Sequence, residues 1–261
     1  MDILYLVGPN SKCDYFDLKC SLRSIDMYGK NVDRVFVCGY CPEFLSNEVI
    51  KLPLSVDKSL PKNKNIWRQI VHCVKNSDIG VYNDGDFLIS MDDHFYMNEV
   101  DFNKYPVLAK LSGEVHGGML PQTPNPKRET HKGYEKILIH TNKFCADHKL
   151  PAVFLTLHAN MRLNKYSIEQ LDDLNNEMFN YKDSDLECVV IAQNYRLLNN
   201  PFRITFAKDF KSSNAQSVEK MLKANKRTVF STGDFEIGDD MYNILKEKYP
   251  NPSKYEKVDI Y

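Results

Sequence analysis

The chain has 261 residues, of which 43% are hydrophobic and 26% charged, and its formal net charge is −1. This length suits one α/β domain, and the apolar content is enough for a sizeable core. A near-neutral charge argues against a protein whose whole surface attracts nucleic acid. No apolar stretch approaches the ~18 residues of a membrane span, and the opening MDILYLVGPN lacks the basic start of a signal peptide. We therefore expect a soluble, cytoplasmic protein.

In the first hundred residues, short apolar runs alternate with two helix patterns. The run DILYLVG stops at Gly8-Pro9, which is typical of a buried strand followed by a turn. The same reasoning predicts strands at 2–8, 33–39, 48–54, 86–91 and 105–111, and helices at 15–29 and 65–76. This β-α-β-β-α-β order predicts an α/β fold with a mixed, mostly parallel sheet flanked by helices.

The second half of the chain is richer in helix patterns. We predict helices at 131–149, 167–179, 185–198 and 241–249, and strands at 152–159, 202–207 and 227–232. Residues 116–133 contain several glycines and prolines and are typical of a long loop, which in compact domains is often a lid or a binding loop. No repeat or linker interrupts the chain, so residues 1–261 are interpreted as one domain.

Two carboxylates and a histidine, Asp92-Asp93-His94, follow the predicted strand at 86–91. If the strand continues, Asp92 and His94 project to the same side. An oxygen and an imidazole there suit Mn²⁺ or another divalent ion, and Asp93 would be free to accept hydrogen bonds from sugar hydroxyls. The alternative is a simple turn, which aspartate forms readily. The carboxyl ends of parallel strands are where α/β sheets bind ligands.

An acidic motif at a strand end, after a β-α-β-β-α half, resembles the GT-A glycosyltransferases, which bind the diphosphate of a nucleotide sugar through a divalent metal. More specifically, the chain is similar to the Stealth proteins, which transfer sugar-1-phosphate from nucleotide sugars. The similar segments are 1–8, 21–45, 91–97, 157–171 and 231–257. Met91 stands where that family has Asn, and the family's Asn-Ser-His before the preceding helix is absent. The resemblance therefore implies the wider class, a single Rossmann-type GT-A-like domain.

Within that class, residues 1–100 would be the nucleotide-sugar-binding half and 101–261 the acceptor half. A divalent metal (Mn²⁺ or Mg²⁺) would be held by Asp92, His94 and His158. The nucleotide sugar, a UDP-sugar by preference, would be bound by Arg23, Asp93 and Lys165. The acceptor hydroxyl, on a glycan or a modified DNA base, would be activated by Asp234, or by Glu114 or His116. Each of these residues also has a structural interpretation, as an ion pair, a turn residue or a solvated side chain.

Several other interpretations remain open. Attack on phosphorus instead of carbon would make the protein a sugar-1-phosphate transferase. Basic stretches at 127–136 and 220–227 suggest nucleic-acid binding, although nearby acids favour ordinary solvated helix faces. The paired aspartates also suit a metal-dependent hydrolase, which usually needs more carboxylates. Cys38 and Cys41 form a CxxC pair that is either a redox or zinc site or two incidental thiols. Trp67, the only tryptophan, is interpreted as a core residue.

Overall fold

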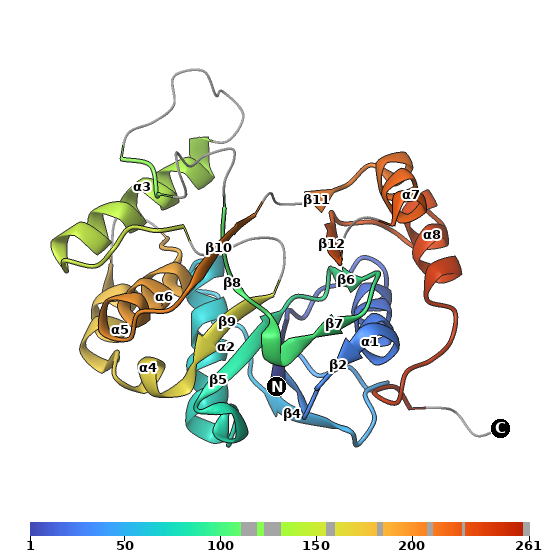
Figure 1. The fold of residues 1–261 in the computed structure, drawn as a ribbon, viewed down its shortest axis with the longest axis horizontal. Helices are drawn as coiled ribbons and strands as arrows, with labels where there is room; N and C mark the ends of the chain where they lie inside the picture. The colour runs from blue at the N-terminus through green and yellow to red at the C-terminus, as the bar shows by residue number, and fades with distance from the viewer. Residues whose placement is uncertain are drawn as a thin grey trace.

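The computed structural model describes residues 1–110, 119–122, 132–154, 160–181, 185–207, 211–225 and 228–257. Within these ranges it is a mixed α/β fold with eight α-helices and a central sheet (Figure 1). Across the same ranges, no helix combines the length and the apolar character needed to cross a membrane.

The central sheet has five strands in the order β4-β3-β1-β5-β9. The first four are parallel to one another, and β9 is antiparallel to β5. Every residue of β1, β3 and β5 is buried, because helices cover both faces, and this is why these strands are nearly continuous apolar runs. The predicted α/β class with a mostly parallel sheet is confirmed. The strands are β1 (Asp2–Val7), β3 (Val35–Gly39), β4 (Val49–Pro53), β5 (Asp86–Ser90) and β9 (Met161–Asn164).

Two hydrophobic cores lie on the two faces of this sheet. Successive side chains of β1 alternate between them, so that Tyr5 packs with Leu22 of α1 on one face while Leu4 packs with Trp67 of α2 on the other. Trp67 is fully buried and its indole N–H donates to Asn175 at 2.8 Å, which confirms its prediction as a core residue. The helices are α1 (Phe16–Tyr28) on the first face, and α2 (Lys62–Asn76), α3 (Lys132–Asp147), α4 (Lys165–Glu169), α5 (Asp172–Asn180) and α6 (Cys188–Asn199) contributing to the second.

Three smaller sheets surround the central one. One of them, together with α7 and α8, encloses a third core around Phe95, Phe230 and Tyr249. In Figure 1, α7 and α8 lie on the side of the molecule opposite to α3–α6. The smaller sheets pair β6 (His94–Tyr96), β12 (Val229–Thr232) and β11 (Lys211–Ser212); β8 (Val107–Lys110) and β10 (Ile204–Ala207); and β2 (Gly29–Lys30) and β7 (Val100–Asp101). The two last helices are α7 (Ala215–Ala224) and α8 (Asp240–Lys248), and short 3-10 turns span Val81–Asn83 and Phe102–Lys104.

The structure differs from the sequence predictions in several places, and the helix α7 and the short strands β2, β6, β7 and β11 were not predicted. The helix predicted at 167–179 is two helices, α4 and α5, separated where Leu171 packs into the core. The strand β9 was not predicted, because its four residues lack a clear period and become a strand only by pairing with β5. Of the strand predicted at 152–159, residues 155–159 lie outside the described part, and Val153 forms only an isolated bridge to Met119. The loop predicted at 116–133 also lies mostly outside it.

Candidate functional site

The connections of the central sheet reverse direction next to β1. From β1 the chain passes through α1 to β3 on one side, whereas from β4 it passes through α2 to β5 on the other side. In α/β sheets, ligands bind in the crevice outside the carboxyl ends of the two strands at such a switch point. Here the edge in question follows Val7 of β1 and Ser90 of β5, and the segment directly after Ser90 is Met91-Asp92-Asp93-His94.

This segment is a tight turn and does not continue the strand. The amide of His94 donates to the carbonyl of Met91 at 3.2 Å, and β6 begins at His94. His94 is buried, and its Nδ1 accepts a hydrogen bond from the Met91 amide at 3.3 Å. The expectation that Asp92 and His94 share one side of a strand is therefore wrong, because the chain reverses between them. His94 serves the turn, and its Nε2 lies 3.7 Å from Oδ1 of Asp93.

Asp93 is held by the strands that pair with β6. Its Oδ2 accepts from the hydroxyl of Ser231 at 2.9 Å and from Nζ of Lys211 at 3.5 Å. Its carbonyl accepts from the amide of Thr232 at 3.3 Å. The Asp93 side chain, expected from sequence to meet sugar hydroxyls, is thus occupied in fixing the turn against β11 and β12.

Asp92 remains half-buried at the sheet edge, and its charge is poorly tolerated there. Burial, followed by the nearby carboxylates of Asp17 and Asp93, raises the pKa of Asp92 to about 7. Asp17 lies in the first turn of α1, and burial together with Asp93 also raises its pKa above the ordinary value. Like charges that gather in a partly desolvated site disfavour ionisation. The edge therefore carries clustered carboxylates, at least one of which titrates near neutral pH.

The beginnings of α2 and α6 lie close to this group. The Asn63 amide donates to Asp185 at 3.1 Å, and the Asn63 side chain donates to Glu187 at 3.3 Å. Burial and then Asp185 raise the pKa of Glu187 to about 7. The exposed Lys62 ammonium acts to lower the pKa of both Asp92 and Glu187, so it lies near both carboxylates. Lys62 thus places one positive charge near two carboxyl groups whose pKa is raised by burial.

The other site residues predicted from sequence lie in different parts of the structure. Asp234 follows β12 and is 82% exposed, and it pairs with Lys12 in the loop after β1 at 3.4 Å. That ion pair places Asp234 on the same edge as Asp92. Glu114, His116 and His158 lie outside the described residues.

Arg23 and Lys165 are not part of this edge. The Arg23 guanidinium donates through Nε and Nη2 to Glu256, both at 2.8 Å, and through Nη1 to the Tyr249 carbonyl. Lys165 adjoins Asn164, which pairs with Asp86 at the beginning of β5, the opposite end of that strand from Asp92. The Lys165 ammonium donates to the Ser77 carbonyl at 3.2 Å. Neither is placed to bind phosphate at the carboxyl edge, because each is engaged elsewhere by contacts between distant segments.

Within the described ranges, no group of three or more His, Cys, Asp or Glu side chains is arranged to hold a metal ion. The carboxylates of Asp17 and Asp92 instead fit a cation that brings most of its ligands with it, as Mg²⁺ on a diphosphate does with one or two protein carboxylates. Such a cation would reduce the electrostatic repulsion between the carboxylates of Asp17 and Asp92. Cys38 and Cys41 are free thiols, and buried Cys38 donates to the Gln69 carbonyl, which favours incidental thiols over a redox pair.

Three residues of this edge were not identified from sequence: Asp17, Lys62 and Glu187. Asp17 could have been identified from sequence, because it lies in the first turn of the helix that follows β1, and such a helix begins at the carboxyl edge of the sheet. No local pattern marks Lys62 or Glu187. No protein-family model matches the chain, and comparison with curated proteins finds no match. The fold and the site therefore define a mixed α/β protein with an acidic group at the switch point of its sheet.

Proposed function

We propose that the protein transfers a sugar from a nucleotide-diphosphate sugar, preferably a UDP-sugar, to an acceptor hydroxyl. The observation that carries this proposal is the Asp92-Asp93 turn at the switch point of a mostly parallel sheet, with Asp17 brought beside it. The similarity of the sequence to GT-A transferases, which place an acidic motif after such a strand, supports the same assignment.

Most residues of the edge have a role in this proposal. The carboxylates of Asp92 and Asp17 would hold the divalent cation (Mn²⁺ or Mg²⁺) of the donor, and that ion would neutralise charge on the leaving diphosphate. Lys62 and Lys211 add positive charge beside the same group, which favours an anionic donor. Asp93 keeps the turn in place through Ser231. Asp234, exposed on the same edge, is the candidate base for the acceptor hydroxyl on a glycan or a modified DNA base.

The test is a calorimetric titration of UDP-sugars into the full chain, with and without Mn²⁺. We expect micromolar binding that requires the metal and weakens at least about tenfold in Asp92→Asn, since that change removes a charge without changing the side-chain shape. The matched control is Asp84→Asn, which makes the same change at an exposed turn before the opposite end of β5. Asp84 has a left-handed backbone (φ 51°), which asparagine also tolerates.

Absence of binding by any nucleotide sugar, or equal effects of the two variants, would overturn the proposal. Where binding is found, product analysis follows with candidate acceptors. Transfer of the sugar supports the glycosyltransferase, transfer of sugar phosphate indicates phosphotransfer, and free sugar without an acceptor indicates a hydrolase.

A further inference from the structure

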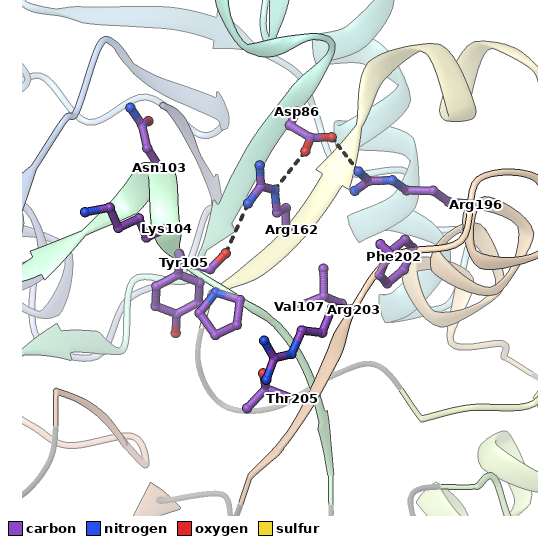
Figure 2. A pocket seen from close by; sticks show the side chains of 11 residues that line it. Asp86, Asn103, Lys104, Tyr105, Val107, Arg162, Arg196, Phe202, Arg203 and Thr205 are labelled. Atoms are coloured by element: carbon purple, nitrogen blue, oxygen red, sulfur yellow. Dashed lines mark hydrogen bonds and ion pairs between the residues drawn. The ribbon is translucent and has the colours of Figure 1, made fainter.

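A concave site lies at the other end of β5. It is a pocket of about 610 Å³ between the beginning of β5, β9, and the segments that carry β8 and β10 (Figure 2). This volume suits a small-molecule ligand. The pocket is separated from Asp92 by the length of β5, roughly 13 Å over the four residue steps from Asp86 to Ser90. It is therefore independent of the proposed transferase site.

The lining of this pocket is strongly basic although the whole chain has a net charge of −1. Among the described residues, four cationic side chains line it, Lys104, Arg162, Arg196 and Arg203, against one carboxylate, Asp86. Lys104 also pairs with Asp101 at 3.3 Å, which leaves the three arginines as the main source of positive charge. A concave surface with one sign of charge concentrates ions of the other sign.

The carboxylate of Asp86 is already engaged by three donors. It accepts from Nε of Arg162 and from Nη2 of Arg196, both at 2.8 Å (Figure 2). The side-chain amide of Asn164 also donates to it, at 2.8 Å. Because two guanidinium groups share one carboxylate, one positive charge remains uncompensated in a partly desolvated place. Asp86 also orients both guanidinium groups, and its remaining acceptor capacity is small because three donors already bind it.

Arg196 supplies the most specific feature. Only 9% of the residue is exposed, yet within the described part of the chain its Nε and Nη1 donors have no hydrogen-bond partner. Buried donors left unpaired are costly, and a guanidinium is suited to bidentate binding of oxyanions. The Arg196 guanidinium lies over the ring of Phe202 at 4.9 Å, which fixes its plane at the pocket wall.

We propose that this pocket binds a small phosphorylated compound, with the phosphate held by the arginines that line it. A phosphate dianion carries two negative charges and several acceptor oxygens, which can pair with more than one arginine. A single carboxylate carries one charge and two oxygens. The organic part of the ligand lies against Phe202, Pro106 and Val107, the apolar part of the lining.

The experiment is a calorimetric titration of inorganic phosphate and of a nucleoside monophosphate into the full chain at low ionic strength, without metal or nucleotide sugar. Arg203 is exposed at the pocket, so Arg203→Glu leaves the buried Asp86 network intact. The matched control is Lys220→Glu, which makes the same change of charge at an exposed position of α7. We expect Arg203→Glu to weaken binding of both ligands at least about tenfold and Lys220→Glu to change it less than about twofold.

Tighter binding of the nucleoside monophosphate than of inorganic phosphate supports the contact of the organic part with Phe202, and equal binding supports a site for free phosphate alone. No binding of either ligand to the unaltered chain overturns the proposal. So does an equal loss in the two charge-reversal variants, or equally tight binding of citrate. Asp92→Asn serves as a further arm: if it abolishes phosphate binding, the phosphate lies at the carboxyl edge and the present assignment is wrong. Failure of this proposal leaves the transferase proposal untouched, because the two sites are titrated with different ligands.

Discussion

At the scale of single residues, Asp92 shows how position changes the chemistry of a common side chain. Its neighbours Met91, Asp93 and His94 are tied into the turn by hydrogen bonds, but Asp92 is left at the sheet edge beside Asp17. Burial and the neighbouring carboxylates raise its pKa to about 7, into the range where a carboxyl group can exchange a proton or bind a cation near neutral pH.

This raised pKa predicts a pH-dependent stability. Between the ordinary value of 3.8 and about 7, the folded protein holds a proton on Asp92 that the unfolded chain has released. Stability therefore falls as pH rises through that window. We expect Asp92→Asn to raise the free energy of unfolding by about 1–2 kcal/mol at pH 8 and to change it little at pH 4. Urea unfolding at the two pH values, followed by the fluorescence of Trp67, measures the difference.

The exposed-turn variant Asp84→Asn is the control and should have the same small effect at both pH values. An effect of Asp92→Asn that does not differ between pH 4 and pH 8 would contradict the assigned pKa. Glu187, whose pKa is also raised to about 7, acts in the same direction, so part of the pH dependence of the unaltered chain should persist in the variant.

At the scale of elements, α2 is fixed against the carboxyl edge by a close approach at Gly39. This last residue of β3 has a φ of 106°, in the region that favours glycine. A Cβ atom there would lie 2.2 Å from Nε2 of Gln69 in α2 and 2.3 Å from the carbonyl oxygen of Val7. Gln69 itself donates to that carbonyl at 3.3 Å. The glycine therefore allows β1, β3 and α2 to meet where the candidate site is built.

Gly39→Ala is expected to destabilise the fold by about 3 kcal/mol or more, because it adds backbone strain and a clash with a main-chain atom. Gly8→Ala is the control on the same edge, since a Cβ at Gly8 meets nothing within 4 Å, and it should change stability by less than about 1 kcal/mol. Chemical denaturation of the two variants compares them directly. Equal stabilities would show that the edge adjusts more easily than the close approach implies.

At the scale of the whole molecule, the last described segment closes the chain onto its first half. Glu256, 5% exposed at its side chain, accepts both bonds from Arg23 of α1 and also the Ser253 amide. Leu45 bridges to Glu256, and the Ser46 amide donates to the Tyr255 carbonyl. The contacts Arg23–Glu256, Leu45–Glu256 and Ser46–Tyr255 each join residues separated by more than two hundred positions. Arg23, predicted to bind phosphate, is used to hold the two halves of the fold together.

Glu256→Ala removes the partner of a mostly buried guanidinium, so it should lower the free energy of unfolding by about 3 kcal/mol. Lys254→Ala, two positions earlier, breaks an exposed ion pair with Asp26 and should cost less than about 1 kcal/mol. Thermal and urea unfolding compare the two variants. A cost for Glu256→Ala as small as that for Lys254→Ala would mean that the C-terminal segment contributes little to the stability of the molecule.

The elements with strong local patterns could be predicted from the sequence alone. The buried runs of β1, β3, β4 and β5 and the amphipathic faces of α1, α2, α3 and α8 were predicted within a few residues, because burial imposes a period that is visible in the chain. Their order predicted the mostly parallel sheet and located the Asp92-Asp93 pair at its carboxyl end.

The surroundings of the Asp92-Asp93 pair depend on tertiary contacts. The pairing of β6 with β12 turned Asp92-Asp93-His94 into a turn and engaged His94 within it. The packing of α1, α2 and α6 brought Asp17, Lys62 and Glu187 to the same edge, and the pairing of β9 with β5 set Arg162 on Asp86. These neighbours lie far apart in the chain, and no local pattern records them, because such contacts depend on how whole elements pack.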